Sequence, residues 1–331
     1  MKQNKVTVVG STSWGITLCN ILSENVDKLF LLSRNDEENK NLNRARYISR
    51  NQKFNIDKNI IISNFAEEII SESNIIIIAV PSANIEENID RICNYITEDH
   101  VIISAVKGFE NNTKKTISRY ILEKLSIPEE NIGVISGPNI SLEIYKNKPA
   151  TSVIGISPIH ENNIRRIFNT NSFRAYSSND VLGIELGGIL KNIFAIGAGI
   201  IFEYNLGTNS MASYITRSLY EITKLSKYFG GEIKTFYGNS GLGDLITTCF
   251  NENSRNNKLG RLIAQGKNLE VALESIDGVV EGIQTTKIIK EILGEKIIEF
   301  PITNEIYKVL FQEKNPMEGI TDLMSRENTN E

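Results

Sequence analysis

An uninterrupted apolar run at residues 75–80 (IIIIAV) constrains the fold of this 331-residue chain more than any other feature. A strand with one face in water alternates apolar and polar side chains, so a run of this kind indicates a strand that is buried on both faces. Such strands lie in parallel sheets that helices cover on both sides. The run therefore predicts the centre of an α/β fold.

Further apolar runs alternate with amphipathic segments in the first half of the chain. The sequence predicts strands at residues 5–9, 28–32, 60–62, 74–80, 101–105, 132–135 and 151–156. Helical spacing lies between these runs, for example at 14–23, 83–95 and 116–124. Strands and helices in alternation predict a mostly parallel sheet with right-handed crossovers.

The pattern changes near residue 180. Residues 181–229 and 258–331 have helical periodicity, and no segment there has the pattern of a strand, which predicts an all-helical second domain. Residues 183–202 are long enough to cross a membrane, but Glu185 and Lys191 lie within them, and charges inside a bilayer are costly. We interpret this stretch as a buried helix and expect no membrane insertion.

Charge and cysteine usage narrow the class of protein. A net charge of -4 gives no broad basic surface, so we expect no nucleic-acid partner, and a local cluster of cations must hold any anionic ligand. The three cysteines are scattered without CxxC spacing, which argues against a disulfide framework or a zinc site. We therefore expect a cytoplasmic protein that has no secretory signal and binds no metal.

A glycine-containing loop, VGSTSWG at residues 9–15, follows the first predicted strand and precedes a helix. This is the position of a dinucleotide-binding G-x-G-x-x-G loop, in which Gly10 would make the tight turn and Gly15 would let helix and strand pack closely. The helix N-terminus would offer N–H groups to a pyrophosphate. Thr12 replaces the middle glycine, and its side chain could crowd the phosphates. The loop alone leaves both nucleotide binding and a plain strand–helix turn open.

The end of the second predicted strand bears on the choice of nucleotide. An NAD-preferring fold usually places Asp or Glu there, against the ribose 2′-hydroxyl, whereas this chain has Ser33 and Arg34. An arginine can pair with a 2′-phosphate or stack on adenine, and it can also be a solvated loop residue. NADH and NADPH therefore both remain open as cofactors.

Lysine is the candidate for proton transfer. Ligands of open α/β sheets bind beyond the carboxyl ends of the strands, where Lys107 follows one predicted strand. His100 precedes a strand and His160 lies in a predicted linker, so we expect structural roles for both histidines. A lysine that is partly desolvated among other cations gives up its proton more readily, and it can then serve as general acid or base.

Several strings match a known family, in order and over essentially the whole chain. They are GSTSWG (10–15), AVPS (79–82), SAVKGFE (104–110), ISGPN (135–139), GIELGGILKNIFAIGAGI (183–200), ITRSLYE (215–221), GNSGLGDLITTC (238–249), NSRNNKLG (253–260) and VVEGIQTT (279–286). The sequence resembles the bacterial NAD(P)-dependent glycerol-3-phosphate dehydrogenases. Such a resemblance implies a Rossmann-like NAD(P)-binding domain at 1–180 and a helical substrate-binding and catalytic domain at 181–331.

The resemblance also implies an activity. The chain would reduce dihydroxyacetone phosphate reversibly to sn-glycerol 3-phosphate with NADH or NADPH, and so supply glycerophospholipid synthesis. The substrate would be a small phosphorylated molecule. We further expect a homodimer, for which the helical domain offers a surface.

Roles for single residues carry over position by position. Lys191 would be the proton donor and acceptor, Asp244 would orient it, and Lys107 would help to stabilise the oxyanion. The implied cofactor contacts are Gly10, Ser13, Trp14, Gly15, Arg34, Lys107, Ser141, Arg255, Val279 and Glu281. The implied substrate contacts are Lys107, Gly137, Asn139, Lys191, Asp244, Ser254, Arg255 and Asn256, the last three of which would hold the phosphate.

Two positions depart from the family, which usually has glycine at 12 and serine at 139 where this chain has Thr12 and Asn139. Two other functions remain open. One is a reductase of similar plan that acts on a β-hydroxy acid or ketopantoate, which would need no phosphate grip at 254–256. The other is a non-catalytic nucleotide-sensing or scaffold protein, in which Thr12 marks a decayed loop.

Overall fold

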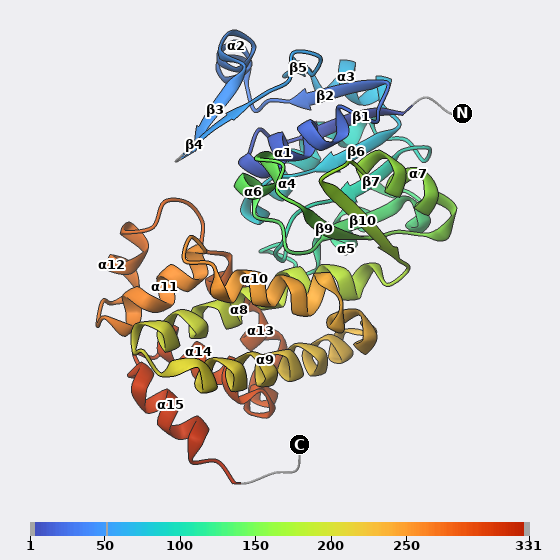
Figure 1. Ribbon diagram of the computed structural model, residues 1–331. Coiled ribbons are helices and arrows are strands. Elements are labelled where there is room, and N and C mark those ends of the chain that lie inside the picture. The colour runs from blue at the N-terminus through green and yellow to red at the C-terminus, as the bar shows by residue number, and fades with distance from the viewer. Residues whose placement is uncertain (1–3, 51, 328–331) are drawn as a thin grey trace. The chain divides into compact units, whose positions relative to one another are not determined.

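The computed structural model describes residues 4–50 and 52–327, and it divides into two compact units, Met1–Glu185 and Leu186–Glu331. The first unit is an α/β structure, and the described part of the second contains helices without strands (Figure 1). This confirms the fold class that the sequence predicts. The domain boundary after residue 180 stays a prediction.

The described residues of the first unit form an eight-stranded sheet in the order β10-β9-β8-β7-β6-β1-β2-β5. Its strands are β1 Lys5–Val9, β2 Lys28–Leu32, β5 Ile61–Ser63, β6 Ile75–Ile78, β7 Val101–Ser104, β8 Ile132–Ser136, β9 Ala150–Gly155 and β10 Phe173–Ser178. Neighbouring strands are parallel except β8 and β9, which are antiparallel. The mostly parallel sheet is therefore confirmed.

The apolar run that predicts a doubly buried strand lies in the middle of this sheet as β6, between β7 and β1. Ile75 and Ile77 belong to the hydrophobic core on one face, and Ile76 and Ile78 belong to the core on the other. None of the four is more than 2% exposed. Burial on both faces removes any place for a polar residue, which is why this strand does not alternate.

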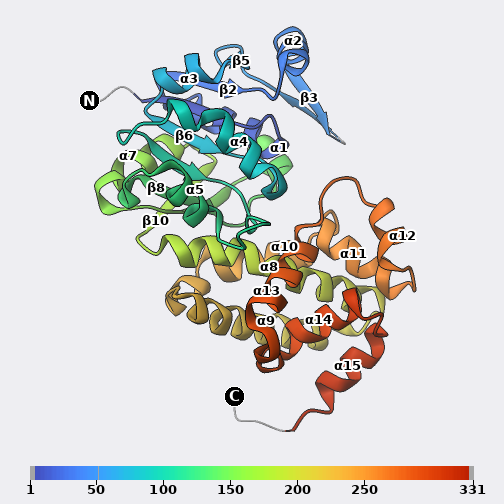
Figure 2. The ribbon, with the colours of Figure 1, turned by 180° about the vertical axis from the view of Figure 1, so that it is seen from behind.

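Helices cover both faces of the sheet (Figures 1 and 2). One core contains residues of α1 Ser13–Leu22, α2 Asp36–Ala45, α6 Ser141–Tyr145 and α7 Pro158–Phe168. The opposite core contains residues of α3 Ala66–Glu72, α4 Ile85–Ile92 and α5 Ile117–Leu125. The helical spacing at 83–95 is divided in the structure, because 3-10 turns at Ser82–Asn84 and Cys93–Tyr95 flank α4.

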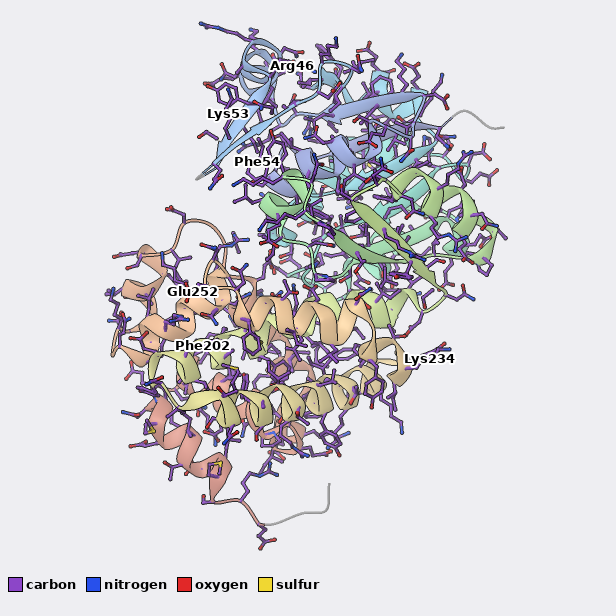
Figure 3. The ribbon with its side chains drawn as sticks, in the orientation of Figure 1. Arg46, Lys53, Phe54, Phe202, Lys234 and Glu252 are labelled. Atoms are coloured by element: carbon purple, nitrogen blue, oxygen red, sulfur yellow. The ribbon has the colours of Figure 1, made fainter. Side chains whose placement is uncertain are left out.

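Some elements have no clear signal in the sequence. Strand β10 alternates buried Phe173 with exposed Tyr176 at the edge of the sheet. A separate hairpin, β3 Tyr47–Arg50 and β4 Gln52–Asn55, packs through Phe54, whose ring lies 5.0 Å from that of Tyr145 (Figure 3). The expectation that His160 lies in a linker is wrong, because this residue is in α7. Strand β10 and the β3–β4 hairpin are short and half exposed, and they bury too few apolar residues to give a clear strand pattern in the sequence.

The second unit is built from helices. They are α8 Val181–Glu203, which begins in the first unit, α9 Gly207–Phe229, α10 Asp244–Phe250, α11 Arg255–Ala264, α12 Leu269–Glu274, α13 Glu281–Leu293, α14 Pro301–Phe311 and α15 Pro316–Met324. Shorter helical turns are η4 Ile233–Tyr237, η5 Asn239–Gly243, which is a π-helical turn, and η6 Gly294–Glu299.

Helix α8 lies in the interior of the protein. Among the described helices it alone has the length and apolar character to cross a membrane, and its apolar window is entirely buried within the protein. Glycines let neighbouring helices approach it closely: a Cβ on Gly199 would lie 2.0 Å from the Asn257 carbonyl oxygen, and one on Gly260 would lie 1.9 Å from the Ile196 carbonyl oxygen. The prediction of a buried, tightly packed helix is confirmed.

Candidate functional site

The loop between β1 and α1 has the backbone shape that its two predicted glycines require. Gly10 has φ +114°, and a Cβ there would lie 2.8 Å from the Ala79 carbonyl oxygen at the end of β6. A Cβ on Gly15 would lie 2.0 Å from the Gly10 carbonyl oxygen. Gly10 therefore makes the tight turn, and Gly15 allows the turn to pack on the first turn of α1.

Thr12 caps helix α1. Its Oγ accepts a hydrogen bond of 2.9 Å from the Gly15 N–H and donates one of 2.8 Å to the Ala79 carbonyl oxygen. The hydroxyl is thus held within the protein, although the sequence suggested that it would crowd a bound phosphate. Ser13 and Trp14 are the first two residues of α1, whose N–H groups have no acceptor within the helix and are available to an anion.

Arg34, two residues beyond β2, is held by Glu38 of α2, a residue that the sequence analysis missed. The Arg34 N–H donates to Glu38 Oε2 at 2.7 Å, and Arg34 Nη2 donates to Glu38 Oε1 at 2.9 Å. Partial burial by itself would raise the pKa of the Glu38 carboxyl, but hydrogen bonds from Arg34 and from the Ser11 side chain lower it below its usual value. The Asn35-x-x-Glu38 pattern of a helix capping box was the available signal, since Asn35 Oδ1 accepts from the Glu38 N–H.

Predicted substrate residues of the first unit meet beyond β7 and β8. Lys107 Nζ donates to the Gly137 carbonyl oxygen at 2.9 Å. Asn139 Oδ1 accepts from Ser152 Oγ at 2.7 Å, whereas the buried Nδ2 of the same amide has no partner among the described residues. A buried donor without a partner needs an explanation, and a ligand oxygen is one. Ser141, a predicted cofactor contact, begins α6, where its carbonyl oxygen accepts from Thr17 of α1 at 3.4 Å.

In the second unit, Lys191 of α8 and Asp244 of α10 form a buried ion pair, in which Lys191 Nζ donates to Asp244 Oδ1. The two residues are 7% and 1% exposed. Asp244 begins α10 directly after the π-helical turn η5, which carries the GLG residues that precede it in the sequence. The pair brings together two residues that are 53 positions apart.

An amide network joins Asn192, the residue after Lys191, to two further predicted strings. Asn256 Nδ2 donates to Asn192 Oδ1 at 2.9 Å, and the Gly282 N–H donates to Asn256 Oδ1 at 3.0 Å. Asn192 follows Lys191, Asn256 follows Arg255, and Gly282 follows Glu281. The network thereby connects the starts of α11 and α13 to the turn of α8 that contains Lys191. The side-chain amide of Asn256 uses its oxygen and one of its two N–H groups in these bonds. The predicted contact with a phosphate would use the second N–H.

The N-terminus of α11 has the features of an anion site. Ser254 is the N-cap, its Oγ accepts from the Asn257 N–H at 3.4 Å, and no acidic residue lies in the first turn. Arg255 is the first helical residue, is exposed, and has no ion-pair partner within the part of the chain that the structure describes. A Cβ on Gly278, which has φ +90°, would lie 2.9 Å from Arg255 Nη1. This places the guanidinium beside the loop that leads to predicted residues Val279, 44% exposed, and Glu281.

The predicted residues therefore form two sets. The first unit holds Gly10, Ser13, Trp14, Gly15, Arg34, Lys107, Gly137, Asn139 and Ser141. The second unit holds Lys191, Asp244, Ser254, Arg255, Asn256, Val279 and Glu281. Within the described residues, no group of three or more His, Cys, Asp or Glu could hold a metal ion.

The two histidines have structural contacts. His100 Nδ1 accepts from the Thr97 N–H at 2.9 Å, so Nε2 is the nitrogen that donates to the Ile70 carbonyl oxygen at 3.2 Å. His160 Nε2 lies 2.6 Å from Asn131 Oδ1. The His100 ring connects the loop before β7 to α3, and the His160 ring connects α7 to the 3-10 turn Glu129–Asn131.

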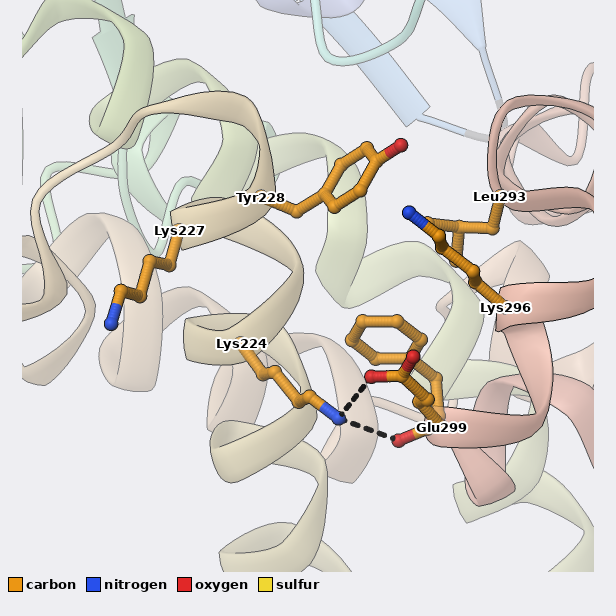
Figure 4. Close-up of a pocket in the computed structure, with 7 residues that line it drawn as sticks. Lys224, Lys227, Tyr228, Leu293, Lys296 and Glu299 are labelled. Atoms are coloured by element: carbon orange, nitrogen blue, oxygen red, sulfur yellow. Dashed lines mark hydrogen bonds and ion pairs between the residues drawn. The ribbon is translucent and has the colours of Figure 1, made fainter.

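The second unit contains a pocket of about 270 Å³ (Figure 4). It is lined by Lys224, Lys227, Tyr228, Leu293, Lys296, Glu299 and Phe300. Lys224 donates to the carboxylate and to the carbonyl oxygen of Glu299, at 3.0 and 3.2 Å. None of the predicted site residues lines this pocket, and its lysines are at the surface, so we assign it no part in the site.

Comparisons with known proteins agree on one family. The N-terminal profile of the NAD-dependent glycerol-3-phosphate dehydrogenases matches residues 5–162, and the C-terminal profile of the same family matches residues 180–321. The chain is 36% identical to the glycerol-3-phosphate dehydrogenase (NAD(P)+) of Clostridium botulinum over 99% of both chains. It is also 36% identical to that of Fusobacterium nucleatum, over 98% of this chain and 97% of the relative.

A solved structure gives the same result. The crystal structure of glycerol-3-phosphate dehydrogenase from Coxiella burnetii is similar with a TM-score of 0.89 and 26% identity, over 98% of this chain and 99% of that one. The resemblance seen in the sequence motifs is thereby confirmed. The chain is an oxidoreductase that belongs to the NAD(P)-dependent glycerol-3-phosphate dehydrogenase family.

Proposed function

We propose that this protein catalyses the reversible, NAD(P)-dependent reduction of dihydroxyacetone phosphate to sn-glycerol 3-phosphate, with Lys191 as the proton donor and acceptor. One observation carries the proposal: the buried Lys191–Asp244 ion pair is connected, through the hydrogen bond between Asn192 and Asn256, to the helix start that carries Arg255. A proton-transfer group and an anion site are thus held in one network.

The residues of the first unit fit a dinucleotide. Cβ atoms at Gly10 and Gly15 would meet backbone oxygens, so only glycine lets the β1–α1 loop take this tight shape at the start of α1. The N-terminus of α1 adds unpaired N–H groups and the positive end of the helix dipole, which favour a pyrophosphate. When bound, the nicotinamide supplies a hydride to the substrate carbon.

Lys191 supplies the proton in this proposal. Its ammonium carries three hydrogens, and Asp244 accepts one of them, so another can be donated to the carbonyl oxygen as it becomes an alkoxide. In the oxidation direction, the amine takes the hydroxyl proton back. Asp244 is almost completely buried, and its role is to hold the ammonium in one position. Lys107, on the first unit, adds a second positive charge for the developing oxyanion.

The phosphate of the substrate is assigned to the start of α11. The guanidinium of Arg255 can form two parallel, charge-assisted hydrogen bonds with phosphate oxygens, and the helix dipole favours the same charge. Ser254 and the free N–H of Asn256 add neutral donors. A reductase that acts on ketopantoate or another unphosphorylated acid would not need a phosphate site, and the comparison of substrates below distinguishes the two functions.

We also propose the cellular setting. The protein would work in the cytoplasm as a homodimer, without a nucleic-acid partner or membrane insertion, and would run toward sn-glycerol 3-phosphate to supply glycerophospholipid synthesis. The burial of α8 and the net charge of -4 support the absence of membrane and nucleic-acid partners.

Oxidation rates of NADH and NADPH with different keto substrates test this function. We expect turnover with dihydroxyacetone phosphate and little or none with ketopantoate at the same concentration. A preference for ketopantoate would replace the assignment by that of an unphosphorylated-acid reductase. Binding of neither nucleotide in a fluorescence titration would favour a non-catalytic scaffold protein.

A further inference from the structure

A carboxylate stands at the end of β2, although no acidic residue occupies the expected position in the sequence. Glu38 lies four residues after Arg34, in the first turn of α2, and its side chain turns back toward Arg34. One carboxylate oxygen accepts from the Arg34 N–H, the other accepts from the Arg34 guanidinium, and Ser11 of the β1–α1 loop also donates to this group. Glu38 thereby connects the two loops that border the end of β2.

The charge around Arg34 is negative. Asp36, Glu37 and Glu38 all lie in the first turn of α2, and Glu87 of α4 is close enough to act on the Arg34 charge. The Arg34 side chain is 64% exposed, whereas that of Glu38 is only 18% exposed and so is held in place. The second arginine near this strand end, Arg91, donates to the carbonyl oxygens of Ser33 and Asn64.

In dinucleotide-binding folds, the end of β2 faces the 2′ position of the adenosine ribose. A 2′-hydroxyl needs an acceptor there, which a carboxylate provides. A 2′-phosphate needs a free cation, and it is repelled by a carboxylate. The Arg34 guanidinium already donates to Glu38 through Nη2, so a 2′-phosphate that approached Arg34 would also lie beside the Glu38 carboxylate and be repelled by it.

We propose that Glu38 makes this protein select NADH over NADPH, by accepting from the ribose 2′-hydroxyl and by repelling a 2′-phosphate and compensating the charge of Arg34. This proposal rests on the proposed function, which assigns the dinucleotide to the β1–α1 loop. It gives a specificity-determining role to a residue outside the motifs that mark the family.

Equilibrium binding of the two nucleotides tests the proposal without measuring turnover. The wild-type chain, Glu38→Gln and a matched control, Glu37→Gln, are titrated with NADH and with NADPH while nucleotide fluorescence is followed. Glu37 lies in the same turn of α2, and its replacement removes the same charge. Glutamine at 38 can still accept from the Arg34 N–H, so the variant keeps the contact that orders the loop.

We expect the wild type to bind NADH at least about tenfold more tightly than NADPH, which corresponds to one charge-assisted hydrogen bond. Glu38→Gln should reduce this ratio by about tenfold, with tighter NADPH binding, while Glu37→Gln changes it less than about threefold. Equal or tighter binding of NADPH by the wild type would overturn the proposal, and so would equal effects of the two variants. Tight NADPH binding would leave the proposed function intact, whereas binding of neither nucleotide would contradict both.

Discussion

Lys191, in the middle of the apolar helix α8, forms a buried ion pair with Asp244 at the start of α10. Taking two charges out of water costs free energy that their attraction does not reliably return, so a buried pair of this kind is weak evidence for stability. Well-packed apolar side chains would fill the same space at no such cost. The retention of this pair is therefore better explained by chemistry than by folding.

Replacement of Lys191 tests that chemistry. In Lys191→Arg, the positive charge and a contact to Asp244 persist, but the guanidinium does not release its proton at physiological pH. We expect kcat to fall by about 10² or more, while the dissociation constant of the nucleotide stays within about twofold of wild type. Steady-state kinetics and a nucleotide titration measure the two quantities.

Lys191→Ala and Lys287→Ala complete the comparison. Lys191→Ala should lose activity as well, and it should also lose stability because Asp244 is left buried without its partner. Lys287 is exposed on α13, and its replacement by alanine should leave kcat unchanged. A Lys191→Arg enzyme with wild-type kcat would remove Lys191 from the proton-transfer step.

At the scale of secondary structure, two buried carboxylates each bind the N-terminus of another helix. Glu185 of α8 accepts from the N–H and the hydroxyl of Ser118, in the first turn of α5. Glu221 of α9 accepts from the N–H groups of Ile302 and Thr303, in the first turn of α14. Burial raises the pKa of both carboxyls, that of Glu221 to about 7. Each carboxylate satisfies helix N–H groups that would otherwise be buried without an acceptor.

The raised pKa of Glu221 predicts a pH dependence of stability. The folded state binds the proton more tightly than the unfolded state, whose carboxyl has the ordinary value of 4.5. The contribution to folding stability is therefore fully present below pH 4.5, is lost as the pH rises through about 7, and is constant above that. Its size is on the order of 3 kcal/mol.

Thermal unfolding of the wild type and of Glu221→Gln, followed by far-ultraviolet circular dichroism between pH 5 and 8, isolates this contribution. Glutamine does not titrate, so other ionisable groups cancel in the difference between the two proteins. We expect the wild type to lose stability relative to Glu221→Gln as the pH increases. A difference that is constant over this range would show that Glu221 does not titrate there.

For the molecule as a whole, the sequence predicts the elements better than it predicts their contacts. The buried strands can be predicted from the sequence because an uninterrupted apolar run indicates burial directly, as at β6. Edge strand β10 and the β3–β4 hairpin could not be predicted in this way, because they are short and half exposed. Side-chain partners far apart in sequence, such as Lys191 with Asp244, were predicted only through family resemblance, since composition and periodicity contain no information about them.

Residues whose role depends on side-chain direction were missed for the same reason. Glu38 is one of several acids at the start of α2, and the capping-box pattern that distinguishes it does not show that its carboxylate accepts from Arg34. The sequence did not show that the hydroxyl of Thr12 caps α1, and its effect on a bound phosphate stays a prediction. Asn192 follows the predicted catalytic Lys191 in the string at 183–200. That string gives no sign that Asn192 accepts a hydrogen bond from Asn256.

The central claim is that the network around Lys191 serves a substrate whose phosphate is held at the start of α11. The most direct measurement is kcat/KM for dihydroxyacetone phosphate and for unphosphorylated dihydroxyacetone, in the wild type, in Arg255→Ala and in the control Lys258→Ala, which removes a charge from the same helix. At saturating nucleotide, we expect Arg255→Ala to lower kcat/KM for the phosphorylated substrate by about a hundredfold and to leave that for dihydroxyacetone nearly unchanged, while Lys258→Ala affects neither. Equal losses for both substrates in Arg255→Ala, or no loss for either, would contradict the central claim.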